Sequence, residues 1–311
     1  MLDPKIACKM NHTPLVTAII TTHNRNNLVG RAIESVLNQT YENLECIVVD
    51  DASVVSAEVV CKNYPVEFIY IPKKESKGGN HARNVGIKAA KGEYVAFLDD
   101  DDYWLPTKIE KQVALILEKQ CALVYSNAKP EIIQGNNVTY VGYSLDYTKR
   151  GDMSKKIFMS ICCLNITILA EKQKLFEVGL FDENIRFWQE YELTMRLAQV
   201  SPFYFVDEVL AVYRVDTKDT GRLTNKYNEW LKAVDYIYTK HKKYYSQLSF
   251  LGKYCARMTF VQDAIGRTRN SGLRFKKCIY IFLFYTIFIP ARLILKIKRK
   301  SARKHYFLLC E

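Results

Sequence analysis

The first half of the chain alternates between short apolar segments and longer amphipathic ones. The apolar segments are rich in β-branched residues and end in polar turns, as strands buried on both faces do. Apolar residues at helical spacing follow each of them. The predicted strands cover residues 15–22, 44–50, 66–72, 93–100 and 121–128, and the predicted helices cover 26–40, 56–64, 80–92 and 106–120. This alternation predicts an α/β fold with a mostly parallel, doubly wound sheet and helices on both faces.

The second half has a more mixed pattern. Residues 171–200 predict a helix, a turn and a second helix that begins near Trp188, and residues 202–215 predict one or two strands. From about residue 225 onward the chain is rich in Tyr, Lys and Leu at helical spacing. We therefore expect an α/β domain over residues 14–220 and a helical region over 221–311.

Composition and charge narrow the class of protein. With 49% hydrophobic and 13% aromatic residues the chain has enough apolar surface for a large core, which excludes global disorder. The net charge of +12 lies almost wholly in residues 265–311, which hold twelve Lys and Arg and one acid. A uniformly basic surface is therefore absent, and we expect no nucleic-acid partner.

The spacing of the cysteines and the composition of the first ten residues indicate the cellular compartment of the protein. Nine cysteines are scattered without a C-x-x-C pair, which favours free thiols in a reducing environment. The first ten residues contain no apolar segment of a secretory signal. Both observations predict a cytoplasmic protein.

Acidic residues follow two of the predicted strands. Asp50 and Asp51 follow the apolar run CIVV, and the four consecutive acids at 99–102 follow the apolar run VAFL. Ligands of such sheets bind beyond the carboxyl ends of the strands, so both clusters should lie at one edge. A solvated acidic turn is the simpler explanation for either cluster alone. Two clusters at one edge favour a metal site, because adjacent carboxylates repel unless a cation or water compensates them.

Five segments together resemble the family 2 glycosyltransferases, which have the Rossmann-like GT-A fold and use nucleotide-diphosphate sugars. They occur in the family's order across roughly residues 14–215. The segments are TAIITTHNR, SVLNQTYENLECIVVDDAS, ARNVGIKAAKGEYVAFLDDDD, EVGLFDE and WQEYELTMRL. The resemblance implies that residues 14–128 form the nucleotide-sugar-binding half of a catalytic domain and residues 129–220 the acceptor half.

The resemblance also implies roles for individual residues. Those expected at the nucleotide sugar are Thr21, His23, Asn24, Asp50, Asp51, Arg83, Asp99 and Asp100. Asp99 and Asp101 form the D-x-D pair, with Asp101 on the metal and Asp99 toward the ribose. Glu190, in the position that the family usually gives to Asp, is the catalytic base. Expected near the acceptor or the sugar are Trp104, Trp188 and Gln189.

The chemistry of these residue types agrees with those roles. A departing nucleotide diphosphate gains negative charge, which a hard divalent cation held by carboxylates neutralises. Oxygen ligands suit Mg²⁺ or Mn²⁺. Which of the four acids at 99–102 contacts the metal stays open. The family often has a His where this chain has Asp216, which leaves a third metal ligand in doubt, although Asp216 is itself a possible ligand.

The choice of Glu190 as base also depends on its neighbour. Four residues after Glu192 lies Arg196, which predicts a structural ion pair on a helix. Four residues after Glu190 lies Thr194, so that carboxylate has no such pair. A carboxylate in the first turn of a helix suits a general base, and an acid stabilised by the helix dipole is the alternative.

The C-terminal region holds an apolar run at residues 278–289 followed by a basic segment, KIKRKSARK. As a helix the run would span about 18 Å, short of the bilayer core of about 30 Å. We therefore expect a membrane-associating helical extension that binds anionic headgroups on the inner face of the cell membrane. A core helix with a solvated basic end is the alternative.

These expectations combine into one function. The chain is expected to be an inverting, metal-dependent transferase that moves a single sugar from a UDP-sugar to a polyprenyl-diphosphate-linked saccharide, in O-antigen, capsule or lipopolysaccharide biosynthesis. The Q-x-x-R-W motif of the family's processive synthases is absent. Two alternatives stay open: a nucleotidyltransferase, and a non-catalytic scaffold that binds a nucleotide sugar.

Overall fold

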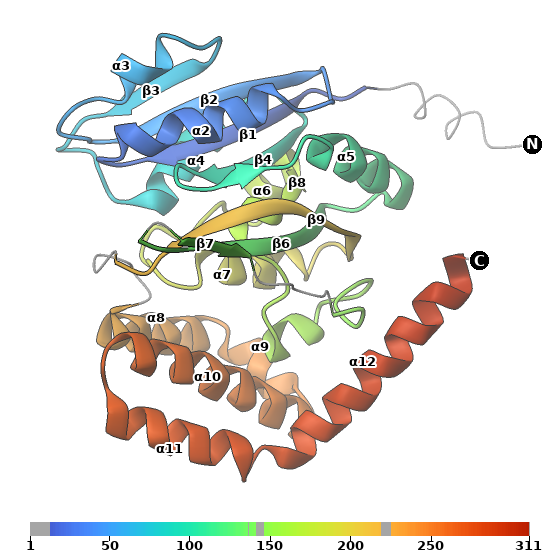
Figure 1. Cartoon of the computed structure of the whole chain (residues 1–311). Helices are drawn as coiled ribbons and strands as arrows, with labels where there is room; N and C mark the ends of the chain where they lie inside the picture. Colours follow the sequence, from blue (N-terminus) through green and yellow to red (C-terminus); the bar gives the residue numbers. More distant parts are fainter. Residues whose placement is uncertain (1–12, 136, 141–145, 219–224, 311) are drawn as a thin grey trace, which may run out of the picture. The chain divides into compact units, whose positions relative to one another are not determined.

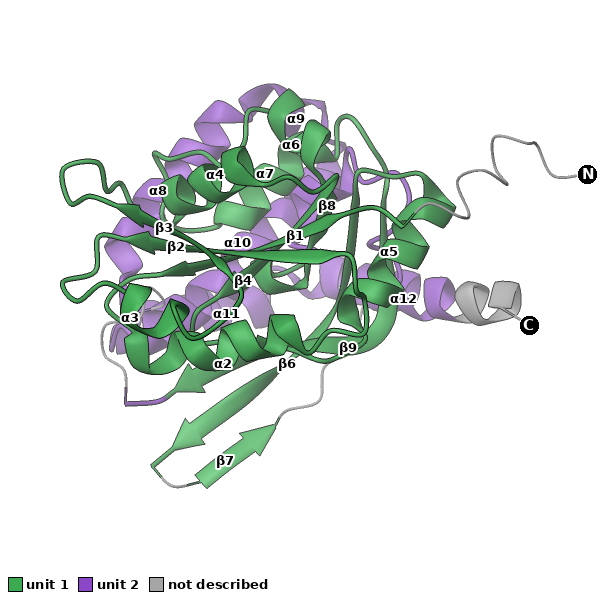
Figure 2. Ribbon diagram, turned by 90° about the horizontal axis from the view of Figure 1, so that it is seen from above, with its two compact units in different colours: residues 1–144, 163–216 green, residues 145–162, 217–311 purple. Residues whose placement is uncertain are grey.

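The structure is a computed structural model that describes residues 13–135, 137–140, 146–218 and 225–310, the last seven by their backbone alone. The first ten residues, on which the expected absence of a secretory signal rests, lie outside this part. The chain divides into two compact units, residues 1–144 with 163–216 and residues 145–162 with 217–311 (Figure 2). The predicted domain boundary at residue 220 stays a prediction.

Unit 1 is built on one nine-stranded sheet (Figure 1). Its strands are β1 (Val16–Thr22), β2 (Leu44–Asp51), β3 (Glu67–Ile71), β4 (Tyr94–Asp99), β5 (Tyr103–Trp104), β6 (Leu123–Gln134), β7 (Asn137–Tyr140), β8 (Leu169–Glu171) and β9 (Phe203–Asp216). They lie in the order β3-β2-β1-β4-β8-β6-β9-β5, and β7 pairs with β6. Strands β3, β2, β1 and β4 are parallel to one another, and β8 joins β4 and β6 by antiparallel pairing.

Helices cover both faces of this sheet, as predicted. They are α2 (Asn26–Leu37), α3 (Glu58–Cys61), α4 (Gly79–Ala89), α5 (Lys108–Lys119), α6 (Lys172–Glu177) and α7 (Gln189–Leu197), with a short 3₁₀ turn, η2 (Asn165–Thr167). Apolar side chains of α2 and α5 pack with Ala18 and Ile20 on one face. On the other face α4 approaches so closely that a Cβ on Gly86 would lie 2.6 Å from Ile19 Cγ2. Figure 2 shows α2 and α4 on opposite sides of β1.

Unit 2 is helical. It contains η1 (Lys156–Met159), α8 (Tyr227–Lys240), α9 (Lys242–Gln247), α10 (Phe250–Asn270), α11 (Arg274–Tyr285) and α12 (Ile289–Cys310). Its core joins α10, through Cys255, Met258 and Val261, to Phe288 and Ala291. Segment 145–162 groups with these helices although it lies between two parts of unit 1 in the sequence.

The apolar run at 278–289 is not one helix, whereas the sequence analysis treated it as a single helix of twelve residues. Helix α11 ends at Tyr285, and Pro290 lies in the first turn of α12, where its missing N–H costs nothing. Within the described residues no single helix is long and apolar enough to cross a membrane. The pair formed by α11 and residues 289–303, bent by 61°, has the length and composition to do so.

Candidate active site

The two acidic strand ends lie at the same edge of the sheet, as the sequence predicts. Strand β1 lies between β2 and β4, with Thr22 paired to Asp50 on one side and Thr21 paired to Asp99 on the other. Parallel strands in this register bring their carboxyl ends together. The loops that follow β1, β2 and β4 therefore form one site.

Asp50 has a structural role in this site. It is fully buried, and its two carboxylate oxygens accept hydrogen bonds from the backbone N–H groups of Ser53 and Ala57, at 2.9 and 2.8 Å. The sequence placed Asp50 at the nucleotide, but its oxygens are already occupied by the turn that follows β2. Its function in the structure is to shape that turn.

Asp51 lies differently. Its backbone carbonyl lies 2.5 Å from His23 Nδ1, but the side-chain Oδ1 is buried without a hydrogen-bond partner in the part of the chain that the structure describes. A buried acceptor without a partner costs about 1–3 kcal/mol. Such an atom fits a ligand that brings its own donor, as the N–H of a uracil-type base does.

The residues after β1 hold the β1 and β2 loops together. Asn24 has a left-handed backbone (φ 55°), which Asn adopts more readily than most residues. Its backbone N–H donates to Ser53 Oγ and its Oδ1 accepts from Val54 N–H, both at 2.7 Å. His23 thus contacts Asp51, and Asn24 contacts the turn that follows it. Their role at the nucleotide stays a prediction.

Thr22, which the sequence analysis passed over in favour of Thr21, reaches the acidic cluster. Its hydroxyl donates to Asp100 Oδ2 at 2.7 Å. Successive side chains of a strand point to opposite faces, so Thr21 and Thr22 do not line the same surface. The alternation of side chains along β1 was the sequence signal that could have separated Thr22 from Thr21.

The four acids at 99–102 have different environments. The side chains of Asp99 and Asp101 are 36% and 27% exposed, whereas that of Asp100 is 5% exposed. Asp102 is also buried, and its Oδ1 accepts from the backbone N–H of Arg214 at 2.8 Å. The two accessible carboxylates are therefore the alternate pair that the D-x-D motif predicts.

Arg25 partly neutralises the cluster. Its Nη1 lies 3.1 Å from Asp100 Oδ1 and 2.9 Å from Asp101 Oδ2. Burial raises the pKa of Asp100 to about 6, while Arg25 and the Thr22 hydroxyl act in the opposite direction. Burial, followed by repulsion from its neighbours, raises the pKa of Asp102 well above its ordinary value. Arg25 was not among the predicted site residues, although it ends the TTHNR segment.

The accessible pair fits a divalent cation. Within the described residues no group of three or more His, Cys, Asp and Glu side chains is placed to hold a metal. Magnesium, however, is commonly held by one or two carboxylates together with substrate phosphates and water. Asp99 and Asp101 supply such a pair. Asp216 forms an ion pair with Arg214 at 3.1 Å.

Arg83 connects the acidic cluster to helix α7. It is buried, its Nη2 lies 2.7 Å from Asp99 Oδ1, and its Nη1 donates to Gln189 Oε1 at 2.7 Å. The resemblance implies that Arg83 lies near the donor diphosphate or sugar, and the structure places it beside Asp99. Gln189 is the first residue of α7, so Arg83 positions the start of the helix that carries Glu190.

The start of α7 is fixed by packing. Trp188 has a left-handed backbone (φ 54°), is buried, and packs edge-on against Tyr191 with ring centroids 5.3 Å apart. Glu190 follows in the first turn and is half-buried. The predicted pair of Glu192 and Arg196 is confirmed, at 2.5 Å. Glu192 is therefore structural, and Glu190 is the other acid of the first turn, next to the Gln189 that Arg83 contacts.

Trp104 does not face the site. Its side chain is buried, its Nε1 donates to the Ile166 carbonyl at 2.9 Å, and Lys108 Nζ lies 4.1 Å from its ring centroid. The expectation that Trp104 lies near the sugar is wrong, because Lys108 covers its ring and η2 holds its N–H.

Comparison with known proteins agrees with this geometry. Residues 17–176 match the model of glycosyl transferase family 2, and an uncharacterized glycosyltransferase of Rickettsia typhi is 33% identical over 223 residues, 70% of each chain. The chain belongs to glycosyl transferase family 2 and is a glycosyltransferase. Two longer rickettsial relatives, from Rickettsia felis and Rickettsia conorii, are matched over 37% of their length.

Two relatives carry more specific names. Escherichia coli WfaP, a UDP-Glc:α-D-GlcNAc-diphosphoundecaprenol β-1,3-glucosyltransferase, is 40% identical over 114 residues, 36% of this chain and 45% of WfaP. The putative teichuronic acid biosynthesis glycosyltransferase TuaG of Bacillus subtilis is 28% identical over 66% of this chain and 81% of TuaG.

Solved glycosyltransferases share the GT-A fold. S. aureus TarS 1–349 in complex with UDP-GlcNAc has a TM-score of 0.55 at 16% identity, covering 86% of this chain and 89% of that one. The mannosyltransferase PcManGT from Pyrobaculum calidifontis, in complex with GDP-Man and Mn²⁺, has a TM-score of 0.56 at 15% identity, covering 96% and 91%.

Proposed function

We propose that this glycosyltransferase moves one sugar from a UDP-sugar to a polyprenyl-diphosphate-linked saccharide, with inversion and with Mn²⁺ or Mg²⁺. Two features at one edge of the sheet carry the proposal: the buried Oδ1 of Asp51 without a partner in the described residues, and the accessible carboxylates of Asp99 and Asp101. The Asp51 oxygen fits the N–H of a uracil-type base. The two carboxylates fit a cation on the diphosphate.

The chain's own residues account for the transfer as follows. Glu190 accepts the proton of the acceptor hydroxyl as that oxygen forms a bond to the anomeric carbon. The bond from this carbon to the diphosphate breaks on the opposite face, and its electron pair leaves with UDP. A bound divalent cation supplies positive charge against the phosphate oxygens. Arg83 holds Asp99 and the first turn of α7 in a fixed relation throughout.

A lipid-linked acceptor is supported by two observations. WfaP, by its name, acts on a diphosphoundecaprenol-linked sugar. Helices α11 and α12 expose large apolar side chains beside basic ones; these are Phe275, Ile279, Phe282, Tyr285, Ile289, Leu293 and Ile297. An amphipathic surface of this kind suits binding to anionic membranes from the cytoplasmic side. We accordingly place the enzyme at the inner face of the cell membrane, in O-antigen, capsule or lipopolysaccharide assembly.

The test is release of UDP, GDP or dTDP from a panel of nucleotide sugars, with a polyprenyl-diphosphate-linked saccharide as acceptor. The proposal predicts UDP release from one donor, dependent on Mn²⁺ or Mg²⁺ and abolished by EDTA. Release of GDP or dTDP, or activity unchanged by EDTA, would contradict it. Pyrophosphate release would indicate a nucleotidyltransferase instead.

A further inference from the structure

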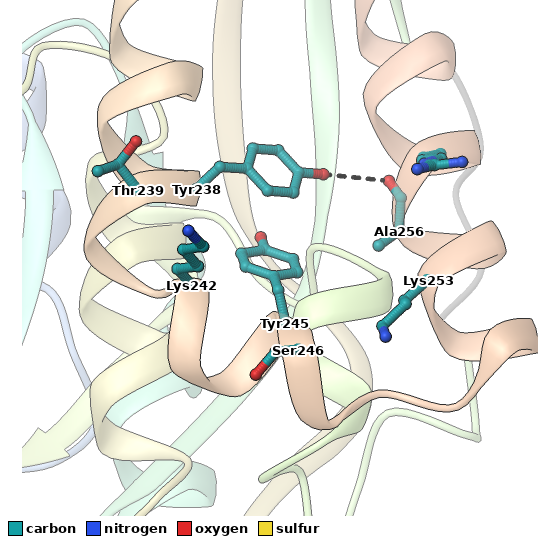
Figure 3. A pocket seen from close by; sticks show the side chains of 8 residues that line it. Tyr238, Thr239, Lys242, Tyr245, Ser246, Lys253 and Ala256 are labelled. Carbon is teal, nitrogen blue, oxygen red and sulfur yellow. Dashed lines mark hydrogen bonds between the residues drawn. The ribbon is translucent and has the colours of Figure 1, made fainter.

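Unit 2 contains a pocket of about 540 Å³ that the transferase reaction does not use. Helices α8, α9 and α10 contribute its lining, which includes Tyr238, Lys242, Tyr245, Lys253 and Arg257 (Figure 3). In Figure 3, Lys242 and Lys253 lie on either side of Tyr245. All of these residues belong to unit 2, so the pocket is a feature of that unit by itself.

The charged side chains of the pocket lining are all cations. Lys242, Lys253 and Arg257 are exposed, and none of them forms a salt bridge with a carboxylate in the described ranges of the chain. Three cations around one cavity repel one another unless an anion compensates them. The composition of the lining therefore indicates a ligand with more than one negative charge.

The floor of the pocket is rigid and aromatic. The rings of Tyr238 and Tyr245 stack with centroids 4.3 Å apart, and the Tyr238 hydroxyl donates to the Ala256 carbonyl at 3.4 Å. Burial raises the pKa of Tyr238 to about 12, so its hydroxyl stays a donor at neutral pH. These contacts join α8, α9 and α10, the helices from which the three cations extend.

An exposed apolar side chain lies beside these cations. Phe250 begins α10 and is 88% exposed. Lys253 and Arg257 follow it at three and seven residues, so all three lie on one face of the helix. An anion site bordered by an exposed aromatic ring suits an amphipathic ligand, with its charged group in the pocket and its chain along the ring.

We propose that this pocket binds the phosphate groups of a lipid, with Lys242, Lys253 and Arg257 as ligands and Phe250 against the lipid chain. The proposal deepens the proposed function, and it rests on that function for the lipid-linked acceptor. A lipid diphosphate carries more negative charge than a phospholipid headgroup, and three cations fit it better. Lipid diphosphates and phospholipid headgroups both present phosphate groups, and the experiment distinguishes between these two ligands.

The experiment compares K242Q/K253Q/R257Q with a charge-matched control, K232Q/K243Q/R269Q, whose three side chains are exposed in unit 2 outside the pocket and outside α11 and α12. Binding of geranyl diphosphate is measured by calorimetry with the transferase site saturated by UDP. We expect the pocket variant to weaken binding by at least about tenfold, because the charge-assisted contacts of three cations to the phosphate groups are lost. The control should change binding by less than about twofold.

A second arm measures binding to phosphatidylcholine vesicles with and without phosphatidylglycerol. Loss of phosphatidylglycerol-dependent binding in the pocket variant alone would support the site and assign it to phospholipid headgroups. Loss of geranyl diphosphate binding alone would assign it to a lipid diphosphate. An unchanged affinity in both arms, or an equal loss in the control, would overturn the proposal.

This design tests the pocket and the proposed transferase function by separate measurements. The binding measurements need no turnover, so they decide the pocket even if the lipid-linked acceptor of the proposed function is wrong. Metal-dependent donor hydrolysis should be equal in wild type and pocket variant, since unit 1 is untouched. Thermal melting of both variants checks that neither replacement unfolds the helices.

Discussion

The guanidinium of Arg83 lies 2.7 Å from the carboxylate of Asp99. Its other terminal nitrogen donates to Gln189 at the start of α7. One buried side chain therefore joins the end of β4, where the donor is expected, to the helix that carries Glu190. The position of the base relative to the donor thus depends on a planar group with donors at both ends.

Replacing Arg83 by Lys should separate charge from geometry. An ammonium keeps the charge but cannot reach both partners at once. We expect kcat/KM for transfer to fall by about 100-fold, comparable to losses from misplaced catalytic groups, with a smaller effect on UDP affinity. Steady-state kinetics and calorimetry measure the two. Wild-type kcat/KM in R83K would show that the bridge has no role in positioning.

The adjacent acids Asp51 and Asp50 have different assigned roles, donor recognition and support of the turn, and the same substitution tests both. Asp51→Asn leaves the fold intact but alters the unpartnered acceptor, so UDP affinity should fall by about tenfold or more. Asp50→Asn should instead lower the free energy of unfolding by about 1–3 kcal/mol, because one backbone N–H of the loop loses its acceptor. Calorimetry and urea denaturation measure these effects. The reverse pattern would contradict the assigned roles.

Lys108 predicts a pH-dependent stability. It is fully buried over the Trp104 ring, and burial lowers its pKa well below the ordinary value. Between the lowered pKa of the folded state and the unfolded pKa of about 10.4, the unfolded chain therefore binds more protons than the folded one, and stability rises with pH in that window.

Lys108→Met removes this dependence. The stability of wild type relative to the variant should rise as the pH rises toward about 10, because Met has no proton to lose. Loss of the hydrogen bond from Lys108 Nζ to the buried Gln112 Oε1 lowers the stability of the variant equally at every pH. Urea denaturation at a series of pH values measures the difference, and Lys111→Met, at a half-exposed position on the same helix, serves as the control. A difference that stays constant with pH would contradict a lowered pKa for the buried Lys108.

The strand and helix pattern of unit 1 was predictable because hydrophobic periodicity is a local property of the sequence. The common edge of the acidic clusters followed from parallel topology. The occupation of individual oxygens did not: Asp50 and Asp51 are adjacent acids, and only the folded turn shows that backbone N–H groups occupy the first. The covering of Trp104 by Lys108, four residues later, likewise depends on how α5 begins.

Two other features depend on distant contacts. Segment 145–162 groups with helices that begin more than sixty residues later, through contacts such as the hydrogen bond from Thr259 Oγ1 to the Met159 carbonyl. The break between α11 and α12 falls at residues 286–288, where Phe288 packs with side chains of α10. Thr286 interrupts the apolar run there and Pro290 follows it, but neither residue identifies α10 as the partner.

Glu190 gives the most direct test of the account. Glu190→Gln and Glu192→Gln make the same chemical change two residues apart on α7. Transfer should fall in E190Q by about 100- to 10,000-fold with UDP affinity unchanged, since a general base contributes that much. E192Q should instead lose about 3 kcal/mol of stability, because Arg196 loses its charged partner.

The measurement is single-turnover transfer, with UDP affinity measured on the same preparations. A large loss of transfer in E190Q at unchanged UDP affinity and thermal stability is the predicted result. Wild-type transfer by E190Q would contradict the assignment of Glu190 as the base, and with it the mechanism proposed for this site.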